Sequence, residues 1–142
     1  MDFCGAVQAL ASRSFAPAIA TFLGYISHDR TDGNAWLYLG IAYTESGLLA
    51  DSLHALHIAE LLIDDNPELS QALGVTHLRS GDLPAARRHL EKSLNHSDPP
   101  ASIHRNIAIL YLQSGEIDRA LHSIDSGIEK NPDDVLSLYA KA

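Results

Sequence analysis

Apolar side chains follow the spacing of α-helices through most of this chain, and the pattern repeats every 34 residues. Trp36, Leu39 and Tyr43 are three or four residues apart, so they fall on one face of a helix. After a short break, Leu49 and Leu56 resume the same spacing. Each repeat therefore predicts two helices of about 13 or 14 residues, joined by a tight turn.

Four columns of equivalent positions carry the repeat. Two columns hold small side chains, which are Ala6, Gly40, Gly74 and Ala108, and Ala18, Ser52, Ala86 and Ala120. Two columns hold apolar side chains, which are Phe15, Leu49, Leu83 and Ile117, and Phe22, Leu56, Leu90 and Ile124. Chance does not align four columns, so the chain is a short array of repeats.

Glycine marks the turn inside a repeat. It recurs in the dipeptides Ser46–Gly47, Ser80–Gly81 and Ser114–Gly115. Glycine can end a helix in the left-handed conformation without a penalty from a β-carbon. In the first repeat Arg13 takes its place, which costs roughly 1 kcal/mol in that conformation unless the turn differs. Between repeats, proline stops one helix and Asn, Ser or Asp caps the next, in the segments 65–67, 97–100 and 131–133.

These features resemble the tetratricopeptide repeat, a 34-residue pattern that begins Trp-x-x-Leu-Gly-x-x-Tyr. Trp36, Leu39, Gly40 and Tyr43 match this pattern in full. The resemblance implies an all-α fold, an α-solenoid of antiparallel helix pairs with a right-handed superhelical twist, formed as a single array over 1–142. The expected units are 1–32, which is degenerate, 33–66, 67–100 and 101–134, and residues 135–142 are expected to begin a further or capping helix.

The sequence departs from the pattern at several positions. His77 stands where the neighbouring units have Tyr43 and Tyr111, and Ser70 and His104 replace the tryptophan. We expect His77 to be a partly buried core histidine, with a pH-sensitive role as the alternative.

In the tetratricopeptide family the first helix of each unit lines the concave side of the array, and the resemblance implies the same here. The apolar floor of this groove suits the hydrophobic side chains of an extended segment or an amphipathic helix. The expected partner-binding residues are Val7, Leu10, Asn34, Leu37, Tyr38, Ile41, Thr44, Gln71, Val75, Leu78, Arg79, Arg105, Ile109 and Leu112. Alternatively, the β-branched side chains among them only pack first helices of adjacent units together.

Some relatives grip the terminal carboxylate of chaperone tails with lysine, arginine and asparagine in the groove. We do not expect that clamp here, because Ile41 occupies the position of its asparagine and only Arg105 and Asn106 remain as partial candidates.

The charge and composition narrow the partners. A net charge of −8 disfavours nucleic acid and anionic lipid. No stretch has the roughly 18 to 20 uncharged apolar residues of a membrane-spanning helix, and no secretory signal is evident. We therefore expect a cytoplasmic protein without a membrane partner. The single Cys4 cannot form an internal disulfide, so cysteine usage leaves the redox compartment open.

Little in the sequence suggests chemistry. His54, His57 and Glu60 are three residues apart on one predicted helix, but a zinc site needs about three or four ligands, and these positions are expected on a solvated outer face. Phosphate-binding, nucleophile-elbow and zinc-protease motifs are missing from the sequence. We therefore expect no catalytic residue, no metal and no cofactor, and predict that the protein is not an enzyme.

The expected function is that of a protein–protein interaction scaffold or adaptor, which binds a partner peptide or helix in its apolar groove. One alternative is a non-catalytic regulatory or substrate-recruiting segment of a larger enzyme. Another is a secretion or assembly chaperone. Self-association is a further alternative, because a second copy could cover the exposed apolar columns and the last unit, which lacks a polar cap.

Overall fold

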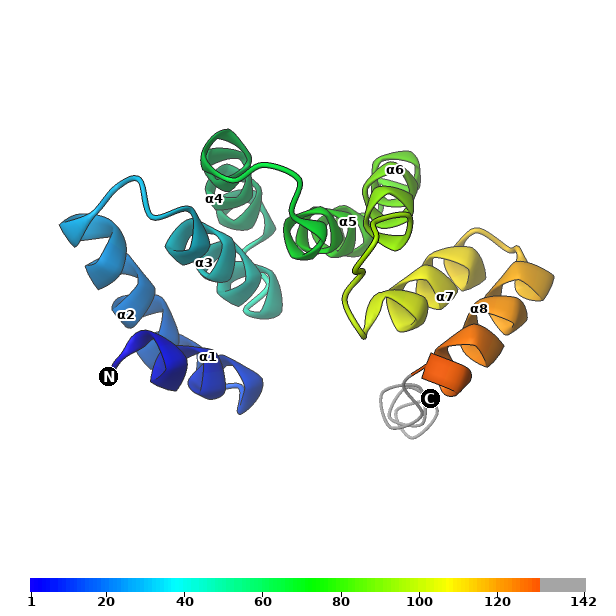
Figure 1. The fold of residues 1–142 in the computed structure, drawn as a ribbon, viewed down its shortest axis with the longest axis horizontal. Coiled ribbons are helices and arrows are strands. Elements are labelled where there is room, and N and C mark those ends of the chain that lie inside the picture. The colour runs from blue at the N-terminus through cyan, green and yellow to red at the C-terminus, as the bar shows by residue number, and fades with distance from the viewer. Residues whose placement is uncertain (131–142) are drawn as a thin grey trace. The chain divides into compact units, whose positions relative to one another are not determined.

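The computed structural model describes residues 1–130, which form eight α-helices and no strand (Figure 1). The helices are α1 (Phe3–Ala11), α2 (Phe15–His28), α3 (Gly33–Glu45), α4 (Leu49–Leu62), α5 (Pro67–Ser80), α6 (Leu83–Leu94), α7 (Ile103–Gln113) and α8 (Ile117–Lys130). The all-α fold of helix, turn and helix is confirmed, although α1 and α7 are shorter than expected. The helix expected at 135–142 lies outside the described residues.

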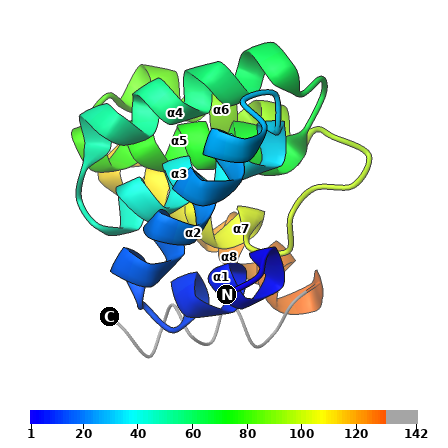
Figure 2. The same ribbon diagram turned by 90° about the vertical axis from the view of Figure 1, so that its left-hand side faces the viewer.

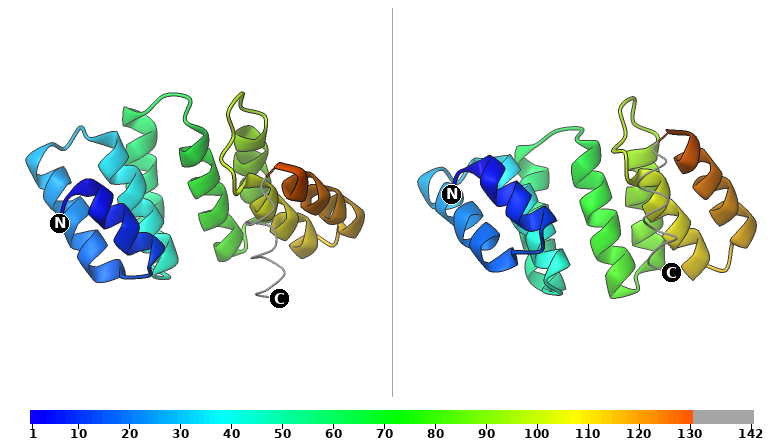
Figure 3. Two further views of the ribbon diagram at one scale, coloured as in Figure 1. Left: turned by 60° about the horizontal axis from the view of Figure 1, so that its bottom comes forward. Right: turned by 90° about the horizontal axis from the view of Figure 1, so that it is seen from below.

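The chain divides into two compact units, Met1–Ala72 and Leu73–Ala142, with the boundary inside α5. In the first unit α1 packs on α2, α2 on α3 and α3 on α4, and Figure 2 shows α2 beside α3. In the second unit α6 packs on α7 and α7 on α8, and Figure 3 shows α7 and α8 side by side. Each unit thus has its own core, built on Phe22 and Leu39 in the first and on Leu90 and Ile107 in the second.

All four turns inside the repeats have the same backbone. Gly47, Gly81 and Gly115 have φ angles of 84°, 86° and 76°, and Arg13 has a φ of 64°. The residue after each of them donates a backbone hydrogen bond to the carbonyl five positions earlier, in the pairs Ser14–Ala9, Leu48–Tyr43, Asp82–His77 and Glu116–Tyr111. The first turn therefore does not differ from the others, and Arg13 adopts the left-handed conformation at a cost of roughly 1 kcal/mol.

The breaks between repeats follow the sequence signals in part. The Asn66 side chain accepts hydrogen bonds from the backbone N–H groups of Glu68 and Leu69, at 2.9 and 3.1 Å, and α5 begins at Pro67 as expected. After the second break α7 begins only at Ile103, beyond the prolines of 97–100. The third break, at 131–133, lies outside the described residues.

The columns of small and apolar residues meet inside each helix pair. The small residues Ala18, Ser52, Ala86 and Ala120 are fully buried. A β-carbon added to Gly40 would lie 2.4 Å from Cδ2 of Leu56, and one added to Gly74 would lie 2.5 Å from Cγ of Leu90. Both leucines are themselves fully buried. Glycine at these two positions thus lets the helix backbone approach the facing leucine.

Two hydroxyl groups are buried between α3 and α4. Oγ1 of Thr44 and Oγ of Ser52 both donate to the backbone carbonyl of Gly40, at 3.1 and 2.8 Å, and they also contact each other. Thr44 is 4% exposed and Ser52 is fully buried. Burial of these hydroxyls is tolerated because each has a hydrogen-bond partner.

Within residues 1–130, none of the helices has both the length and the hydrophobicity needed to cross a lipid bilayer.

Candidate functional site

One stripe of α3 remains open in the first unit. Most of this helix is buried, and the half-buried rings of Trp36, Tyr38 and Tyr43 pack against the core. One set of accessible positions recurs at steps of four, three and four residues along a single face, and it consists of Asn34, Tyr38, Ile41 and Glu45. Asn34 is exposed and the other three side chains are half-buried. We call this set the α3 stripe.

Aromatic rings pack against Tyr38 of the α3 stripe. The ring of Phe3 packs edge-on against those of Phe22, Tyr25 and Tyr38, with centroids 5.3, 5.4 and 5.5 Å apart. Burial raises the pKa of Tyr38, and the adjacent carboxylate of Glu68 raises it further. The Tyr38 hydroxyl therefore stays protonated and donates a hydrogen bond to Glu68.

The remaining predicted residues of the first unit lie around this stripe. Val7 and Leu10 on α1 are half-buried and pack against the core of the unit. Gln71 on α5 is also half-buried. At the end of the stripe, a carboxylate oxygen of Glu45 lies 4.0 Å from a guanidinium nitrogen of Arg13. The Arg13 side chain is 71% exposed.

The second unit carries the other predicted residues. Val75 on α5 and Ile109 on α7 are half-buried and pack against the core of this unit. Arg105 is half-buried, whereas Arg79 and Leu112 are exposed. The first helices of this unit therefore present apolar side chains beside arginines. Those of the first unit present apolar side chains beside carboxylates.

Three predicted residues have no open side chain. Leu78 is 5% exposed because it belongs to the core of the second unit, and Thr44 is buried by the hydroxyl pair with Ser52. Leu37 is 1% exposed. These residues differ from the expectation of an open groove position. By contrast Val7, Ile41, Val75 and Ile109 each keep part of the side chain accessible to water.

An ion-pair network that the sequence did not predict lies at the turn between α7 and α8. Arg87 on α6 pairs with Glu116, and its guanidinium lies 5.3 Å from the ring centre of Tyr111. The hydrogen bond to Glu116 raises the pKa of Arg87. Arg119 lies 3.4 Å from the same carboxylate and 5.9 Å from the same ring centre.

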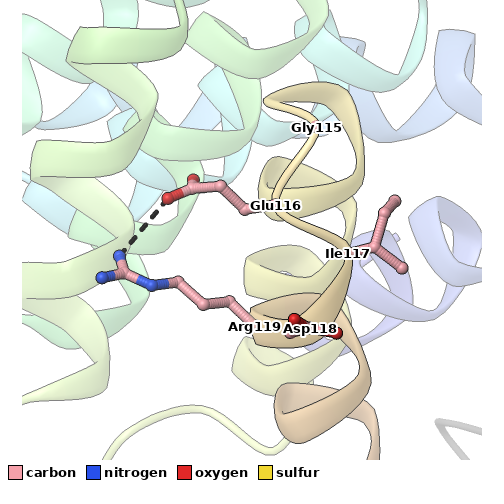
Figure 4. A pocket seen from close by; sticks show the side chains of 5 residues that line it. All are labelled: Gly115, Glu116, Ile117, Asp118 and Arg119. Carbon is pink, nitrogen blue, oxygen red and sulfur yellow. Dashed lines mark ion pairs between the residues drawn. The ribbon is translucent and has the colours of Figure 1, made fainter.

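A small pocket of about 390 Å³ opens at this turn, lined by residues 115–119. Figure 4 shows Glu116 and Arg119 pointing toward each other on one side of the turn, with Ile117 on the other. Because the charges of Glu116 and the two arginines compensate each other, we interpret the network as a link between α6, α7 and α8.

Two histidines of the second unit lie in the positions of the repeat's aromatic residues. His77 is half-buried as expected, and its ring stacks on that of His89 at 5.5 Å. His104 is 8% exposed, and its Nε2 atom is buried without a hydrogen-bond partner. Burial lowers the pKa of His104, and the positive charges of Lys130 and His122 lower it further.

The permissive metal positions lie on the surface. His54 and His57 are exposed, and Nδ1 of His57 is 2.9 Å from Oε1 of Glu60. Among residues 1–130, no group of three or more His, Cys, Asp or Glu side chains is placed to hold a metal ion. Cys4 is exposed.

The comparisons with known proteins agree with the repeat pattern. Residues 77–142 match the family model of the tetratricopeptide repeat. The fold is similar to the crystal structure of TTC0263, a thermophilic tetratricopeptide repeat protein of Thermus thermophilus, with a TM-score of 0.82, 23% identity, and coverage of 96% of this chain and 75% of that one. It is also similar to the crystal structure of MamA, with a TM-score of 0.72, 19% identity, and coverage of 99% and 92%. A comparison with curated proteins gives no match.

Proposed function

Because this chain is a tetratricopeptide repeat protein with the α-solenoid fold of that family, we propose that it is an adaptor that binds an apolar segment of a partner protein on its first helices. The family supports a protein–protein interaction scaffold in general. We further propose that the protein is not an enzyme, because members of this family generally serve as non-catalytic scaffolds. A cytoplasmic location and self-association remain predictions.

One observation carries the proposal. The β-branched residues Val7 and Ile41 in the first unit, and Val75 and Ile109 in the second, are all half-buried at equivalent positions. The column two residues earlier, Leu39, Leu73 and Ile107, is buried to within 2% of its surface. Packing between helices is therefore already served by that column, and the half-open column has apolar surface left for a partner.

The test places a charge on this surface in each unit. Ile41→Glu and Val75→Glu, made together, are expected to abolish capture of the partner in a native pull-down followed by mass spectrometry, because a carboxylate cannot be buried without a counter-charge. Affinity for the captured partner is then measured with purified components. Unchanged affinity of the double variant would refute binding on the first helices.

A matched control separates lost binding from general effects of added charge. Leu61 on α4 is 85% exposed, so Leu61→Glu makes the same chemical change outside the proposed surface. This control should capture the partner like the unmodified protein. Thermal unfolding of all variants shows whether the fold is retained.

A further inference from the structure

We propose that the first unit binds a cationic amphipathic segment of a partner protein, with apolar side chains on Tyr38 and Ile41 and with lysine or arginine beside Glu45 and Glu68. This inference rests on the proposed adaptor function and specifies the chemistry of the partner. It concerns residues 1–72 alone.

The geometry of the α3 stripe gives the apolar part of the surface. Tyr38 and Ile41 are half-buried neighbours three residues apart on one face of α3. The rings of Phe3 and Phe22 contact Tyr38 with centroids 5.5 and 5.9 Å away, which fixes the position of its ring. A preformed apolar surface of this kind favours binding because little side-chain freedom is lost.

Carboxylates lie beside this apolar surface. Glu68 accepts the hydrogen bond of the Tyr38 hydroxyl and is exposed. Glu45 lies one helical turn beyond Ile41, with its side chain 29% exposed. Its contact with Arg13 is long, at 4.0 Å, and the arginine is largely in solvent, so this pair contributes little.

The charge of the whole unit acts in the same direction. Residues 1–72 contain nine acidic and two basic side chains, a net charge of −7. Residues 73–142 contain nine acidic and eight basic side chains, a net charge of −1. The negative potential of the first unit steers cations toward it and disfavours acidic segments. In the second unit, the positions equivalent to Glu45 and Glu68 are Arg79 and Ser102, so this preference belongs to the first unit alone.

The probe is a fluorescein-labelled amphipathic peptide of leucine and lysine at helical spacing, compared with a twin in which glutamate replaces every lysine. Fluorescence anisotropy measures binding of each peptide to the full chain. We expect the lysine peptide to bind more tightly, and its affinity to fall about tenfold in Glu45→Gln with Glu68→Gln, because two ion pairs are lost.

The control removes the same two charges elsewhere in the first unit. Asp51 is exposed on α4 and Asp64 is exposed just after it, so Asp51→Asn with Asp64→Asn has the same net charge as the test variant. This control should change the affinity by less than about twofold, because exposed charges away from the contact are screened. The fluorescence of Trp36, the single tryptophan, reports whether the first unit is folded in each variant.

The outcomes separate this inference from the adaptor function. Equal affinity for both peptides, or equal losses in the test and control variants, would overturn the inference, because binding would then follow bulk charge or apolar surface alone. Capture of the native partner that depends on Ile41 and Val75 would still stand in that case. If Ile41→Glu with Val75→Glu changes neither the affinity for the peptides nor the capture of the partner, both proposals fail.

Discussion

The contact between Gly40 and Leu56 predicts a coupled pair of substitutions. The second and third helix pairs combine glycine with leucine at these positions, whereas α7 and α8 combine Ala108 with Ile124. Ala108 and Ile124 are buried together in one cluster. We expect Gly40→Ala to destabilise the protein, and Leu56→Ile to restore the stability of that variant by reproducing the pairing of α7 and α8.

The magnitude follows from the distance. The added methyl group of Gly40→Ala would lie 2.4 Å from Leu56 Cδ2, so the contact must open by about 1 Å to reach a normal carbon–carbon separation. Overpacking of this kind costs about 1–3 kcal/mol. Alanine regains about 1 kcal/mol of helix propensity over glycine. The expected net loss is about 1 kcal/mol, and the coupling between the two sites is also about 1 kcal/mol.

Urea unfolding of the four members of this cycle measures the coupling. Far-UV circular dichroism follows all helices, and the fluorescence of Trp36 follows the first unit. Coincident transitions license a two-state analysis. Two results would refute the reasoning. In one, Gly40→Ala is as stable as the unmodified protein, which would mean that Leu56 moves aside freely. In the other, the two substitutions are additive.

Two further predictions concern the turns and His104. Gly81→Ala should lower the free energy of unfolding by about 1 kcal/mol, because a φ of 86° is strained for alanine. Gly24→Ala inside α2 should raise it by about 0.5–1 kcal/mol, because alanine favours the helix more than glycine does. Urea midpoints of the two variants that shift in the same direction would contradict this pair of predictions. Because burial lowers the pKa of His104 in the folded protein from its usual 6.5, the unfolded chain binds more protons, so stability should fall as the pH drops below about 6.5. His104→Leu should reduce the difference in urea midpoint between about pH 7.5 and about pH 5.5, and an unchanged difference would show that His104 does not contribute.

The features that repeat were predictable from the sequence. The turn glycines recur at several equivalent positions, and so do the small residues that face the second helices. The periodicity therefore identifies both without knowledge of the fold. The conformation of Arg13 could not be predicted, because one residue without the glycine signal fits either the same turn at a cost or a different turn. The backbone hydrogen bond from Ser14 to Ala9 settles the question.

The candidate site was predictable only in part. Ile41 and Leu37 are neighbours in the helical pattern, and the difference between a half-open and a buried side chain depends on what the surrounding helices cover. The bond between Tyr38 and Glu68 joins residues that the repeat does not relate, since Ala72 and Asn106 stand in the column of Tyr38. For the same reason the pairing of Arg87 with Glu116 left no periodic signal.

The hydroxyls of Thr44 and Ser52 restrict how α3 and α4 can slide along each other. An interface of apolar side chains alone tolerates small shifts, because hydrophobic contact has no direction. Here a shift would part the Ser52 hydroxyl on α4 from the carbonyl of Gly40 and from Thr44 on α3, and a buried hydroxyl left unpaired would cost about 1–3 kcal/mol. Thr44→Val with Ser52→Ala would leave the helices in contact but would remove this penalty. The packing of α3 on α4 would then no longer disfavour the shifted arrangement.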